Sequence, residues 1–467
     1  MKKSENFSEW YNEITEKANL SDKRYPVKGM NIWTSYGWRI MLNIDKIIRE
    51  EMERTKHEEV CFPLLISEDQ FAKEAEHIKG FGEDVFWVTH AGKNPLDVRL
   101  LLRPTSETAM YPIFALWVRS HADLPLKTFQ IVNVFRYETK QTRAFMRVRE
   151  IHFFEAHTCH TDFEDAERQI AEDLEIMDTV AKKLCLPYLN LRRPDWDKFA
   201  GAFYTIGVDT LMPSGKTLQI GGVHQYKENF AKPYNIKYED ENGEHQYVHQ
   251  TTYGMSERLV GAVVGVHGDD SGLVLPPEIA PYQVVIVPVP AKGIQEIVAK
   301  ECKKLDDELF AAGFRVHLDT RDIRPGSKYF DWEIKGVPLR LELGKRDLDK
   351  GVVTFVRRDI GEKKEIERGS LISQVTKILT AITDDLNSAV QKLLLENTTT
   401  VTNLEEARNA SGIVKVGWCS EESCGLKMEE SMEMKVLGTP FKKEEFSGQC
   451  LICAKPTDIV VYLAKTY

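Results

Sequence analysis

The feature that most constrains the fold of this chain is a change in its pattern of strands and helices at the proline-rich segment 275–281, LPPEIAP. Before this segment, apolar strands follow one another as in antiparallel hairpins. After it, short strands alternate with helices, which is typical of a small α/β domain with a mixed sheet. The segment therefore predicts a domain boundary. At ~150 residues per domain, 467 residues leave room for a third domain.

Apolar periodicity predicts the secondary structure on both sides of the boundary. Before it we expect a helix over 38–54, strands over 57–67, 129–138 and 149–158, a long helix, strands over 201–206 and 217–222, and a helix over 256–266. After it we expect a strand over 283–289, a helix over 294–313, a strand over 315–319, a helix over 328–336, strands over 338–344 and 352–358, and a helix from 371 to about 396.

Local signals refine three of these helices. The long helix should open with a capping box at Thr161 and Glu164 and end before Pro187. Gly313 should close the helix that precedes it. Gly261 and Gly265, four residues apart in the helix over 256–266, allow another element to approach closely. A polar run at 397–400 then leads to a cysteine-bearing tail. The expected architecture is an α/β (α+β) chain with domains at 1–280, 281–383 and 384–467.

Composition excludes several classes of protein. With 62 Lys and Arg against 72 Asp and Glu, the net charge of −10 argues against a general nucleic-acid coat protein, although a local basic surface remains possible. The N-terminus is charged throughout and has no apolar core of a signal peptide. The apolar stretches 110–118 and 259–266 are too short to span a bilayer. We therefore expect a cytoplasmic protein without a membrane partner.

The eight cysteines fall into two groups. Cys61, Cys159, Cys185 and Cys302 are scattered through apolar segments, as expected of buried fillers. The others form two close pairs, a spacing that suits a tetrahedral structural zinc site. Two disulfides or four free thiols are the alternatives, although disulfides are rare in a reducing cytosol. The candidate ligands are Cys419, Cys424, Cys450 and Cys453.

The predicted hairpin carries the strongest local charge of the first domain. Five basic residues and one acidic residue give it a net charge of +4 within fourteen residues: Arg136, Glu138, Lys140, Arg143, Arg147 and Arg149. On a strand, Arg136 and Glu138 share a face. A guanidinium there can bind a phosphate or carboxylate bidentately, while the carboxylate accepts a base amine or holds the arginine. The alternative is a solvated basic hairpin.

Two further positions suggest ligand contacts. Thr105 and Glu107 follow an apolar strand, where a hydroxyl and a carboxylate could together bind an ammonium group. The alternative is a helix with Thr105 as its N-cap and Glu107 in its first turn. Arg258, in Ser256-Glu257-Arg258, opens a buried apolar helix and so needs an anionic partner or water. It could otherwise be an ordinary surface residue.

Together and in this order, these signals resemble the catalytic core of class II aminoacyl-tRNA synthetases, most closely the prolyl-tRNA synthetase family of the archaeal and eukaryotic type. The resemblance extends over essentially the whole chain. Three segments resemble the three sequence motifs of the class. The helix 38–53 with the strand ending at Pro63 resembles the first motif. Residues 135–138 with 145–158 resemble the second, and residues 254–269 resemble the third. Thr105 and Glu107 mark the subgroup of the Pro, Thr, Ser and His enzymes. The segments that indicate proline are 198–205, 217–236 and 321–344.

The resemblance implies ATP-dependent attachment of L-proline to tRNA(Pro) through prolyl-adenylate, with release of pyrophosphate and AMP. It implies Mg²⁺ with ATP, whose ligands we do not assign, and a homodimer formed through the first motif. Arg136, Glu138 and Arg258 are the expected catalytic residues. The expected ATP contacts are Arg136, Arg147, Gln219 and Arg258. The expected proline contacts are Thr105, Glu107, Arg136, Phe153, Glu155, His157, Phe199, His224 and Ser256.

The resemblance also gives functions to the other domains. The second resembles an anticodon-binding domain, and we expect Glu333, Arg340 and Arg346 to contact RNA, since reading unstacked bases needs carboxylates as well as cations. The third includes a zinc site in some relatives. Tyr467 ends a strand-like segment that in the family can fold back toward the active site; a docked surface strand is the alternative. Some relatives have Trp at the position of Phe153 and Thr at that of Gly222.

About a hundred residues separate Glu155 from Ser256, which leaves no room for the inserted editing domain of many bacterial prolyl enzymes. We therefore expect measurable activation of alanine, and of cysteine, because a missing methylene costs only ~1–3 kcal/mol of discrimination. The competing interpretations are a Thr-, Ser- or His-type synthetase and a catalytically silent RNA-binding paralogue.

Overall fold

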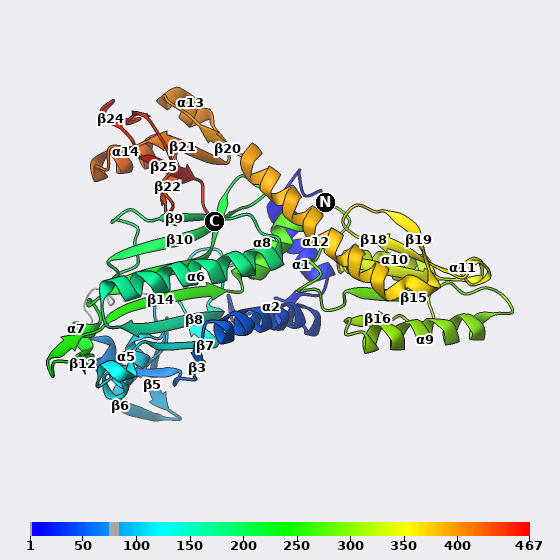
Figure 1. Ribbon diagram of the computed structural model, residues 1–467, viewed down its shortest axis with the longest axis horizontal. Helices are drawn as coiled ribbons and strands as arrows, with labels where there is room; N and C mark the ends of the chain where they lie inside the picture. Colours follow the sequence, from blue (N-terminus) through cyan, green and yellow to red (C-terminus); the bar gives the residue numbers. More distant parts are fainter. Residues whose placement is uncertain (1, 74–83) are drawn as a thin grey trace.

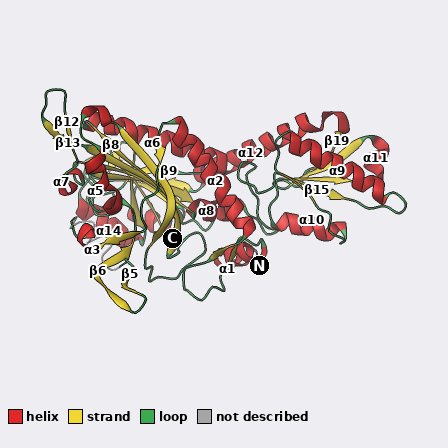
Figure 2. Cartoon of the chain, turned by 90° about the horizontal axis from the view of Figure 1, so that it is seen from below, coloured by secondary structure: helices red, strands yellow, loops and turns green. Residues whose placement is uncertain are grey.

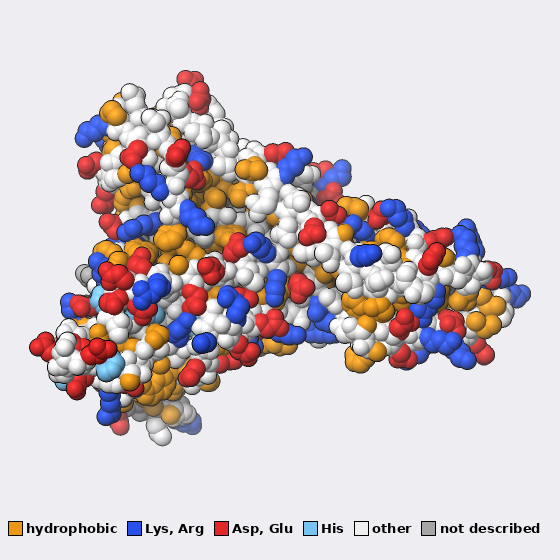
Figure 3. All heavy atoms as spheres, viewed as in Figure 1, with side chains coloured by type: hydrophobic (Ala, Val, Ile, Leu, Met, Phe, Trp, Pro, Cys, Tyr) orange, Lys and Arg blue, Asp and Glu red, His pale blue; other side chains and the backbone are white. Residues whose placement is uncertain are grey.

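The computed structural model describes residues 2–73 and 84–467. Figure 1 shows a large sheet crossed by long helices, a lobe containing β15 and α9 on one side, and the C-terminal elements above the sheet. No helix among the described residues is long and apolar enough to cross a membrane. Figure 3 shows acidic and basic side chains interspersed over one face of the molecule, which agrees with the modest net charge.

The sheet at the centre of the molecule has eleven strands in the order β20-β21-β25-β22-β9-β10-β11-β14-β8-β7-β3. Its catalytic part is antiparallel from β9 to β7. The strands of this part are β3 (Glu58–Glu59), β7 (Leu126–Phe135), β8 (Glu150–His160), β9 (Leu189–Arg192), β10 (Tyr204–Leu211), β11 (Thr217–Lys227) and β14 (His249–Ser256). The predicted hairpin is therefore confirmed as β7 and β8, paired from Leu126–Cys159 to Phe135–Glu150.

Helices cover one face of this sheet, and their apolar residues join the inward-facing strand residues in the largest core cluster. They are α1 (Phe7–Lys17), α2 (Ser35–Arg54), α6 (Phe163–Leu184) and α8 (Arg258–His267). Because side chains alternate along a strand, Phe154 of β8 enters this core while Phe153 faces the opposite side. The opposite face is left open for a site.

The start of α6 differs from the expected capping box. The N-cap is Asp162, whose carboxylate accepts from the N–H of Asp165, so the prediction of Thr161 and Glu164 was one residue too early. The end is as expected, since Cys185 closes α6 in a left-handed conformation before Pro187.

The two glycines of α8 permit close packing, as their spacing predicts. A Cβ at Gly261 would lie 2.9 Å from the carbonyl oxygen of Phe145, which belongs to the loop between β7 and β8. A Cβ at Gly265 would lie 2.3 Å from the side chain of Met212. The charged hairpin loop is therefore held directly against the helix that begins with Arg258.

The segment 57–67 forms only two short strands where one was expected. Pro63 lies between β3 and β4, and proline cannot donate a ladder hydrogen bond. The second strand belongs to a small three-stranded sheet, β4-β6-β5. The peripheral elements are β1 (Ser21–Asp22), β2 (Ile32–Trp33), β4 (Leu65–Ser67), α3 (Glu68–Phe71), β5 (Trp87–Ala91), β6 (Asn94–Leu102), α5 (Glu107–Trp117), η1 (His121–Asp123), α7 (Ala231–Tyr234), β12 (Lys237–Glu239) and β13 (His245–Tyr247).

The α/β domain has a five-stranded mixed sheet in the order β16-β15-β17-β18-β19. Helices α9 and α12 lie on one face and α10 on the other, as Figure 2 shows. Gly313 follows α9 in a left-handed conformation, as expected. The elements are β15 (Val284–Pro288), α9 (Gln295–Ala311), β16 (Val316–Leu318), α10 (Pro325–Ile334), β17 (Leu339–Leu343), α11 (Lys345–Lys350), β18 (Val352–Arg357), β19 (Lys363–Glu367), η2 (Arg368–Ser370) and α12 (Leu371–Glu396).

The C-terminal elements continue the catalytic sheet. Strand β22 pairs with β9, with Thr439 opposite Arg192, so two segments nearly 250 residues apart are joined edge to edge. Helix α12 runs without a break across the expected boundary at 383/384. The polar run at 397–400 contributes a strand. The elements are β20 (Thr398–Thr400), α13 (Leu404–Asn409), β21 (Ile413–Gly417), α14 (Glu422–Met432), β22 (Lys435–Pro440), β23 (Gly448–Gln449), β24 (Pro456–Thr457) and β25 (Val460–Ala464).

Candidate functional site

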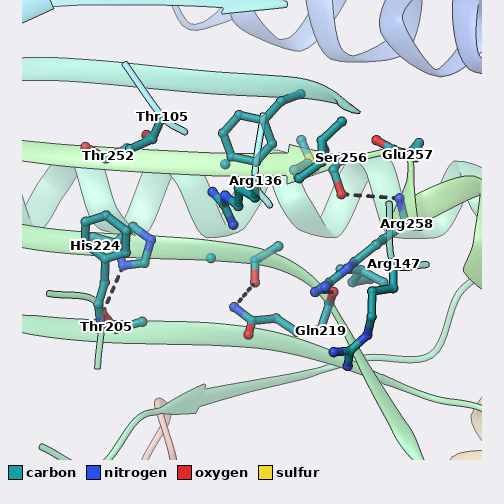
Figure 4. Close-up of a pocket in the computed structure, with 18 of the residues that line it drawn as sticks. Thr105, Arg136, Arg147, Thr205, Gln219, His224, Thr252, Ser256, Glu257 and Arg258 are labelled. Carbon is teal, nitrogen blue, oxygen red and sulfur yellow. Dashed lines mark hydrogen bonds between the residues drawn. The ribbon is translucent and has the colours of Figure 1, made fainter. Parts of the chain in front are cut away.

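A cavity of about 350 Å³ opens on the face of the antiparallel sheet opposite α6. Strands β8, β11 and β14 supply its floor, and the hairpin loop and the start of α8 supply one wall. Figure 4 shows Thr105 and His224 at one end, Arg147 and Arg258 at the other, and Arg136 between them. The predicted residues that line it are Thr105, Glu107, Arg136, Glu138, Arg147, Phe153, Phe199, Gln219, His224, Ser256 and Arg258.

The cationic end of the cavity is formed by Arg136, Arg147 and Arg258. The Nε of Arg258 donates to the Met146 carbonyl at 2.9 Å, and its Nη1 donates to the Gln219 carbonyl at 3.2 Å. The Nε of Arg136 donates to the Pro104 carbonyl at 3.1 Å. Main-chain carbonyls thus fix the direction of two guanidinium groups and leave them positively charged, which suits a polyphosphate.

Burial makes these charges costly. Burial, with Arg136 and Arg147 nearby, lowers the pKa of Arg258 to about 10. Burial also lowers the pKa of Arg136. A group whose charged form is disfavoured in this way gains from an anionic ligand, because the ligand compensates the charge.

Arg147 is held differently, by an ion pair with Glu138 whose Nη1–Oε2 distance is 3.3 Å. The other carboxylate oxygen of Glu138 accepts from the N–H of Lys140 at 2.9 Å. Glu138 therefore fixes both Arg147 and the turn of the loop, whereas the sequence pattern suggested that it would hold Arg136.

Glu257, at the same end, was not predicted as a site residue. Its carboxyl group is buried, and burial raises its pKa to about 8. Among the described residues, its Oε2 has no hydrogen-bond partner. It is thus a buried acid that faces a set of arginines. It stands between two residues that the sequence singled out, Ser256 and Arg258.

The acidic end of the cavity is formed by Glu107 with Thr105 and Tyr226. Thr105 donates to one carboxylate oxygen of Glu107 at 2.6 Å, and Tyr226 donates to the other at 2.8 Å. Glu107 is also the first residue of α5, as the helix alternative predicted, but the N-cap is Ser106 and not Thr105. Two neutral hydroxyl donors orient the carboxylate without cancelling its charge, which suits an ammonium group.

Glu155 and His157 do not line the cavity, although the sequence predicts them as proline contacts. Both lie fully buried beneath its floor, where Thr105 and Thr252 separate them from the open space. Burial opposes ionisation of Glu155, but hydrogen bonds from His157, Ser106 and Gln130 lower its pKa to about 2. Burial likewise opposes the charge of His157, and Glu155 with Glu107 nevertheless raises its pKa. The pair supports the floor.

An aromatic wall closes the acidic end. The ring of Phe199 lies 4.6 Å from that of His224, between centroids, and His224 stacks on Tyr226 at 6.2 Å. Burial lowers the pKa of His224 to about 4, so the ring is neutral at pH 7. Its Nδ1 lies 2.9 Å from the hydroxyl of Thr205. The oxygen of this hydroxyl accepts from the Phe199 N–H, so its proton is free to be donated to Nδ1. A neutral ring that accepts at Nδ1 presents an N–H donor at Nε2.

Two glycines determine how much room the cavity has. A Cβ at Gly254 would lie 2.9 Å from the ring of Phe153, so a side chain there would displace this wall. A Cβ at Gly222 would lie 3.3 Å from Nε2 of His224 and 3.4 Å from Nε2 of Gln219. Gly222 therefore lies next to a residue of each end of the cavity. Relatives with Thr at this position would have a side chain at this point of the cavity, where this chain has none.

Several lining residues were missed from the sequence. Tyr226, a buried residue that donates to Glu107, was missed as well. It follows His224 by two, and strand alternation would have found it if the strand predicted over 217–222 had been extended to the observed end of β11 at Lys227. Arg193, Asp197 and Lys198 come from the loop between β9 and β10 and had no local signal. The other missed lining residues include Thr205, Thr252, Gly254 and Glu257.

The four C-terminal cysteines come together as the spacing predicts. Their sulfur atoms all lie within 4.8 Å of one another, and the Cys419–Cys453 distance is 3.6 Å. All four are free thiols, so the disulfide alternative does not hold. Tetrahedral Zn–S bonds of about 2.3 Å place sulfurs ~3.8 Å apart. Burial opposes ionisation of Cys450, but N–H groups of Cys453 and Ile452 lower its pKa to about 7. The donor set fits zinc.

The three residues predicted to contact RNA lie in the α/β domain. The Arg340 guanidinium covers the ring of Tyr329 at 4.2 Å and donates to Glu342 at 3.0 Å. Glu333 lies one turn after Tyr329 on α10, and Arg346 is exposed on α11. The domain is tied to the catalytic part by Arg358, whose two Nη atoms donate to Asp269 at 2.8 and 2.6 Å.

Comparison with known proteins matches all three parts. The class II core domain of tRNA synthetases (G, H, P, S and T) matches residues 86–267. An anticodon binding domain matches residues 283–378, and a prolyl-tRNA synthetase C-terminal domain matches residues 401–467. With the antiparallel sheet and its cavity, these matches define a class II aminoacyl-tRNA synthetase.

Full-length relatives narrow the class. The chain is 57% identical over 473 residues to the proline–tRNA ligase of Pyrococcus abyssi, covering 99% of this chain and 98% of the relative. It is 50% identical over 467 residues to that of Methanosarcina mazei, covering 99% and 97%. The structure of Giardia lamblia prolyl-tRNA synthetase in complex with prolyl-adenylate matches with a TM-score of 0.97 and 34% identity, covering 100% and 99% of the two chains. The chain belongs to the proline–tRNA ligase family.

Proposed function

We propose that this ligase joins L-proline to ATP, forming prolyl-adenylate and pyrophosphate, and then transfers the prolyl group to the terminal ribose hydroxyl of tRNA(Pro), releasing AMP. The observation that carries the proposal is the cavity's polarity: an acidic end suited to the amino acid's nitrogen and a cationic end suited to a triphosphate. The adenylate-bound relative supports the same intermediate.

In the first step, a carboxylate oxygen of proline attacks the α-phosphorus of ATP, and the bond to pyrophosphate breaks. Arg136 lies between the two ends, where its guanidinium can contact both the proline carboxylate and the α-phosphate. Arg147, Arg258 and Gln219 bind the nucleotide, and Glu138 holds Arg147. No side chain forms a covalent bond with the substrate. The rate gain comes from orientation and from compensation of charge at phosphorus.

At the other end, Glu107 and Thr105 receive the proline nitrogen, and Phe153, Phe199, His224 and Ser256 surround the ring. Because Glu155 and His157 lie beneath the floor, we assign them the role of orienting Thr105, Ser106 and Thr252 instead of touching proline. In the second step the ribose hydroxyl oxygen attacks the activated carbonyl carbon and AMP leaves.

Class II synthetases use Mg²⁺ with ATP. Glu257 is the residue of this chain that best fits such an ion, because it lines the cavity and its buried Oε2 has no hydrogen-bond partner among the described residues. Carboxylate oxygens are preferred magnesium ligands, and the ion compensates phosphate charge when bound. The cationic residues still orient the triphosphate in this proposal.

For the remaining parts we propose a catalytic domain at 1–280, an anticodon-binding domain at 281–383 with Glu333, Arg340 and Arg346 contacting tRNA, and a zinc domain at 384–467. Since α12 spans 383/384, this last boundary divides a continuous helix. A homodimer through the 38–63 region and a cytoplasmic location complete the proposal. Incubation with labelled proline, ATP and unfractionated tRNA tests the function; charging of tRNA with proline is expected, and its absence would contradict the proposal.

We propose that Cys419, Cys424, Cys450 and Cys453 hold one structural zinc ion. Four sulfur donors leave no open coordination position, so the ion stabilises the C-terminal domain and takes no part in the reaction. Metal analysis of the purified chain should give one zinc per chain. A content far below one, in protein that charges tRNA normally, would contradict the proposal.

We propose that the enzyme activates alanine, and cysteine, measurably and does not hydrolyse the mischarged tRNA in cis. The interval from Glu155 to Ser256 is filled by α6, α7 and the strands of the core sheet with their β12–β13 hairpin. The pocket rejects a smaller side chain only through lost apolar contact. Rapid deacylation of alanyl-tRNA(Pro) by the pure protein would refute this.

A further inference from the structure

The loop 193–203, between β9 and β10, forms part of the acidic end of the cavity. It carries Asp197, Lys198 and Phe199, whose side chains line the open space. The N–H of Phe199 donates to Thr205, and its ring lies against His224. The position of this loop therefore sets the position of the aromatic wall. Two contacts tie the loop to the C-terminal domain.

The first contact is made by Arg193, at the start of the loop. Its Nη1 and Nη2 donate to the two carboxylate oxygens of Asp209 at 2.7 and 2.9 Å, and Nη1 also donates to the carbonyl of Leu437 at 2.5 Å. Its Nε lies 3.8 Å from Asp197. The guanidinium is buried, and Gly207 makes room for it, since a Cβ there would lie 2.1 Å from Nη2. One side chain thus joins β10, the loop and β22.

Strand β22 is shaped to provide this carbonyl. Its register shifts between Val436 and Gly438, and such a bulge redirects a backbone group out of the ladder. Gly438 has a φ of +130°, and a Cβ there would lie 2.1 Å from the carbonyl oxygen of Arg192. Glycine is therefore required where the C-terminal strand meets the end of β9.

The second contact is made by Trp196, which packs into the core of the C-terminal domain. Its ring meets that of Trp418 edge to face, with centroids 5.9 Å apart and an interplanar angle of 88°. A Cβ at Gly425, on α14, would lie 2.3 Å from Cη2 of Trp196. The same core contains Cys424 and Cys450. A residue of the active-site loop is thus built into the cysteine-bearing domain.

We propose that the C-terminal domain is the scaffold of the acidic end, and that Arg193 and Trp196 are positioning residues that set the affinity and selectivity for the amino acid. They act through Phe199 and Asp197 and make no contact with the nucleotide end. This inference rests on the proposed function, because its readout is activation of proline.

The sharpest test is a substitution in the other domain, Gly425→Ala. Alanine favours a helix more than glycine does, so α14 itself is not weakened. The new methyl group instead forces the ring of Trp196 to move. In proline-dependent pyrophosphate exchange we expect the KM for proline to rise about tenfold with kcat little changed, since a lost contact that serves substrate and transition state equally raises KM alone. The KM for ATP should stay within twofold, and the preference for proline over alanine should fall. Gly369→Ala, where a Cβ meets nothing within 4 Å, is the matched control.

Arg193→Lys gives a second, independent test, because lysine keeps the charge but cannot bridge Asp209 and Leu437 together. We again expect the KM for proline to rise while the KM for ATP stays within twofold. A fall in kcat with both KM values unchanged, or unchanged selectivity in either folded variant, would overturn the inference. Failure of the wild-type enzyme to exchange with proline would instead contradict the proposed function, so the two failures are distinguishable.

Discussion

The two ends of the cavity hold their charges in different ways. At the cationic end, Arg136 and Arg258 are oriented by main-chain carbonyls of Pro104, Met146 and Gln219. At the acidic end, Glu107 is oriented by side-chain hydroxyl groups of Thr105 and Tyr226. A carbonyl cannot be removed by a point substitution, whereas a hydroxyl can. Arg136 and Arg258 are therefore fixed by the fold. Arg147, which Glu138 holds, and the acidic end can be altered by single side-chain substitutions.

The buried acids of the two ends also differ. Beneath the acidic end, partners lower the pKa of Glu155 to about 2, below its ordinary value of 4.5. At the cationic end, burial raises the pKa of Glu257 to about 8 from the same ordinary value. A carboxyl group with a lowered pKa stabilises the fold at neutral pH, and one with a raised pKa does the opposite. Substitution of each acid by its amide should therefore have opposite effects on stability.

The largest expected effect is that of Glu155→Gln. Removing one partner of a buried pair costs ~3–5 kcal/mol at pH 7, because the amide keeps one neutral acceptor oxygen in place of the two charged ones that His157, Ser106 and Gln130 use. The contribution of Glu155 is complete above its unfolded pKa and is lost as the pH falls toward 2, so the gap to wild type should narrow below about pH 4.5. Urea unfolding across this range measures it, with exposed Glu58→Gln as the control. A stability difference between Glu155→Gln and wild type that does not change with pH would contradict the lowered pKa of Glu155.

Next comes the cationic end. Arg136→Ala should cost ~3 kcal/mol or more in adenylate formation, since charged hydrogen bonds are worth roughly 1.5–3 kcal/mol each. Proline-dependent exchange of pyrophosphate into ATP measures this loss as a fall of at least a hundredfold. Exchange near the wild-type rate would remove Arg136 from the mechanism.

The third effect has the opposite sign to the first. Wild type should lose stability as the pH rises from 4.5 toward 8, because Glu257 ionises in the unfolded chain before it does in the folded one. Glu257→Gln has no ionisable group at this position, so it should not lose stability in this way. Relative to wild type, the variant should gain about 2.5 kcal/mol of folding stability between pH 5 and pH 7, at a little under ~1.4 kcal/mol per pH unit. Parallel pH profiles for the two proteins, measured without nucleotide, would show that Glu257 is ionised when folded.

The smallest expected effect tests the acidic end of the cavity. Tyr226→Phe removes one hydroxyl donor from Glu107 and keeps the ring that stacks on His224. A neutral hydrogen bond is worth about 1 kcal/mol, so the KM for proline should rise about fivefold while the KM for ATP does not change. Tyr247→Phe is the control. A larger change in the KM for ATP than in that for proline would contradict the separation of the two ends.

The same contrast explains what the sequence could predict. The cationic end was found because Arg136 and Arg147 stand in one hairpin and Arg258 opens a buried apolar helix. The cysteine pairs were found because metal ligands have short, regular spacings. Glu138 and Arg258 were placed correctly beside them. Local patterns of this kind need no knowledge of how distant segments meet.

The acidic end was predicted less completely because it is built from distant segments. The family resemblance named Glu155 and His157 as proline contacts, but no local pattern could tell that Thr105 and Thr252 cover them. Arg193 had no signal at all, because its role depends on Leu437, 244 residues further along the chain. The joining of β22 to β9 was missed for the same reason, since pairing between distant edge strands leaves no periodicity in either one.

Pyrophosphate exchange measured with each of the twenty amino acids tests the central claim most directly. The geometry predicts exchange that is strongest with proline, weak with alanine and cysteine, and absent with threonine, serine and histidine. Exchange driven best by another amino acid, or by none, would contradict the account of the cavity as a site for proline activation.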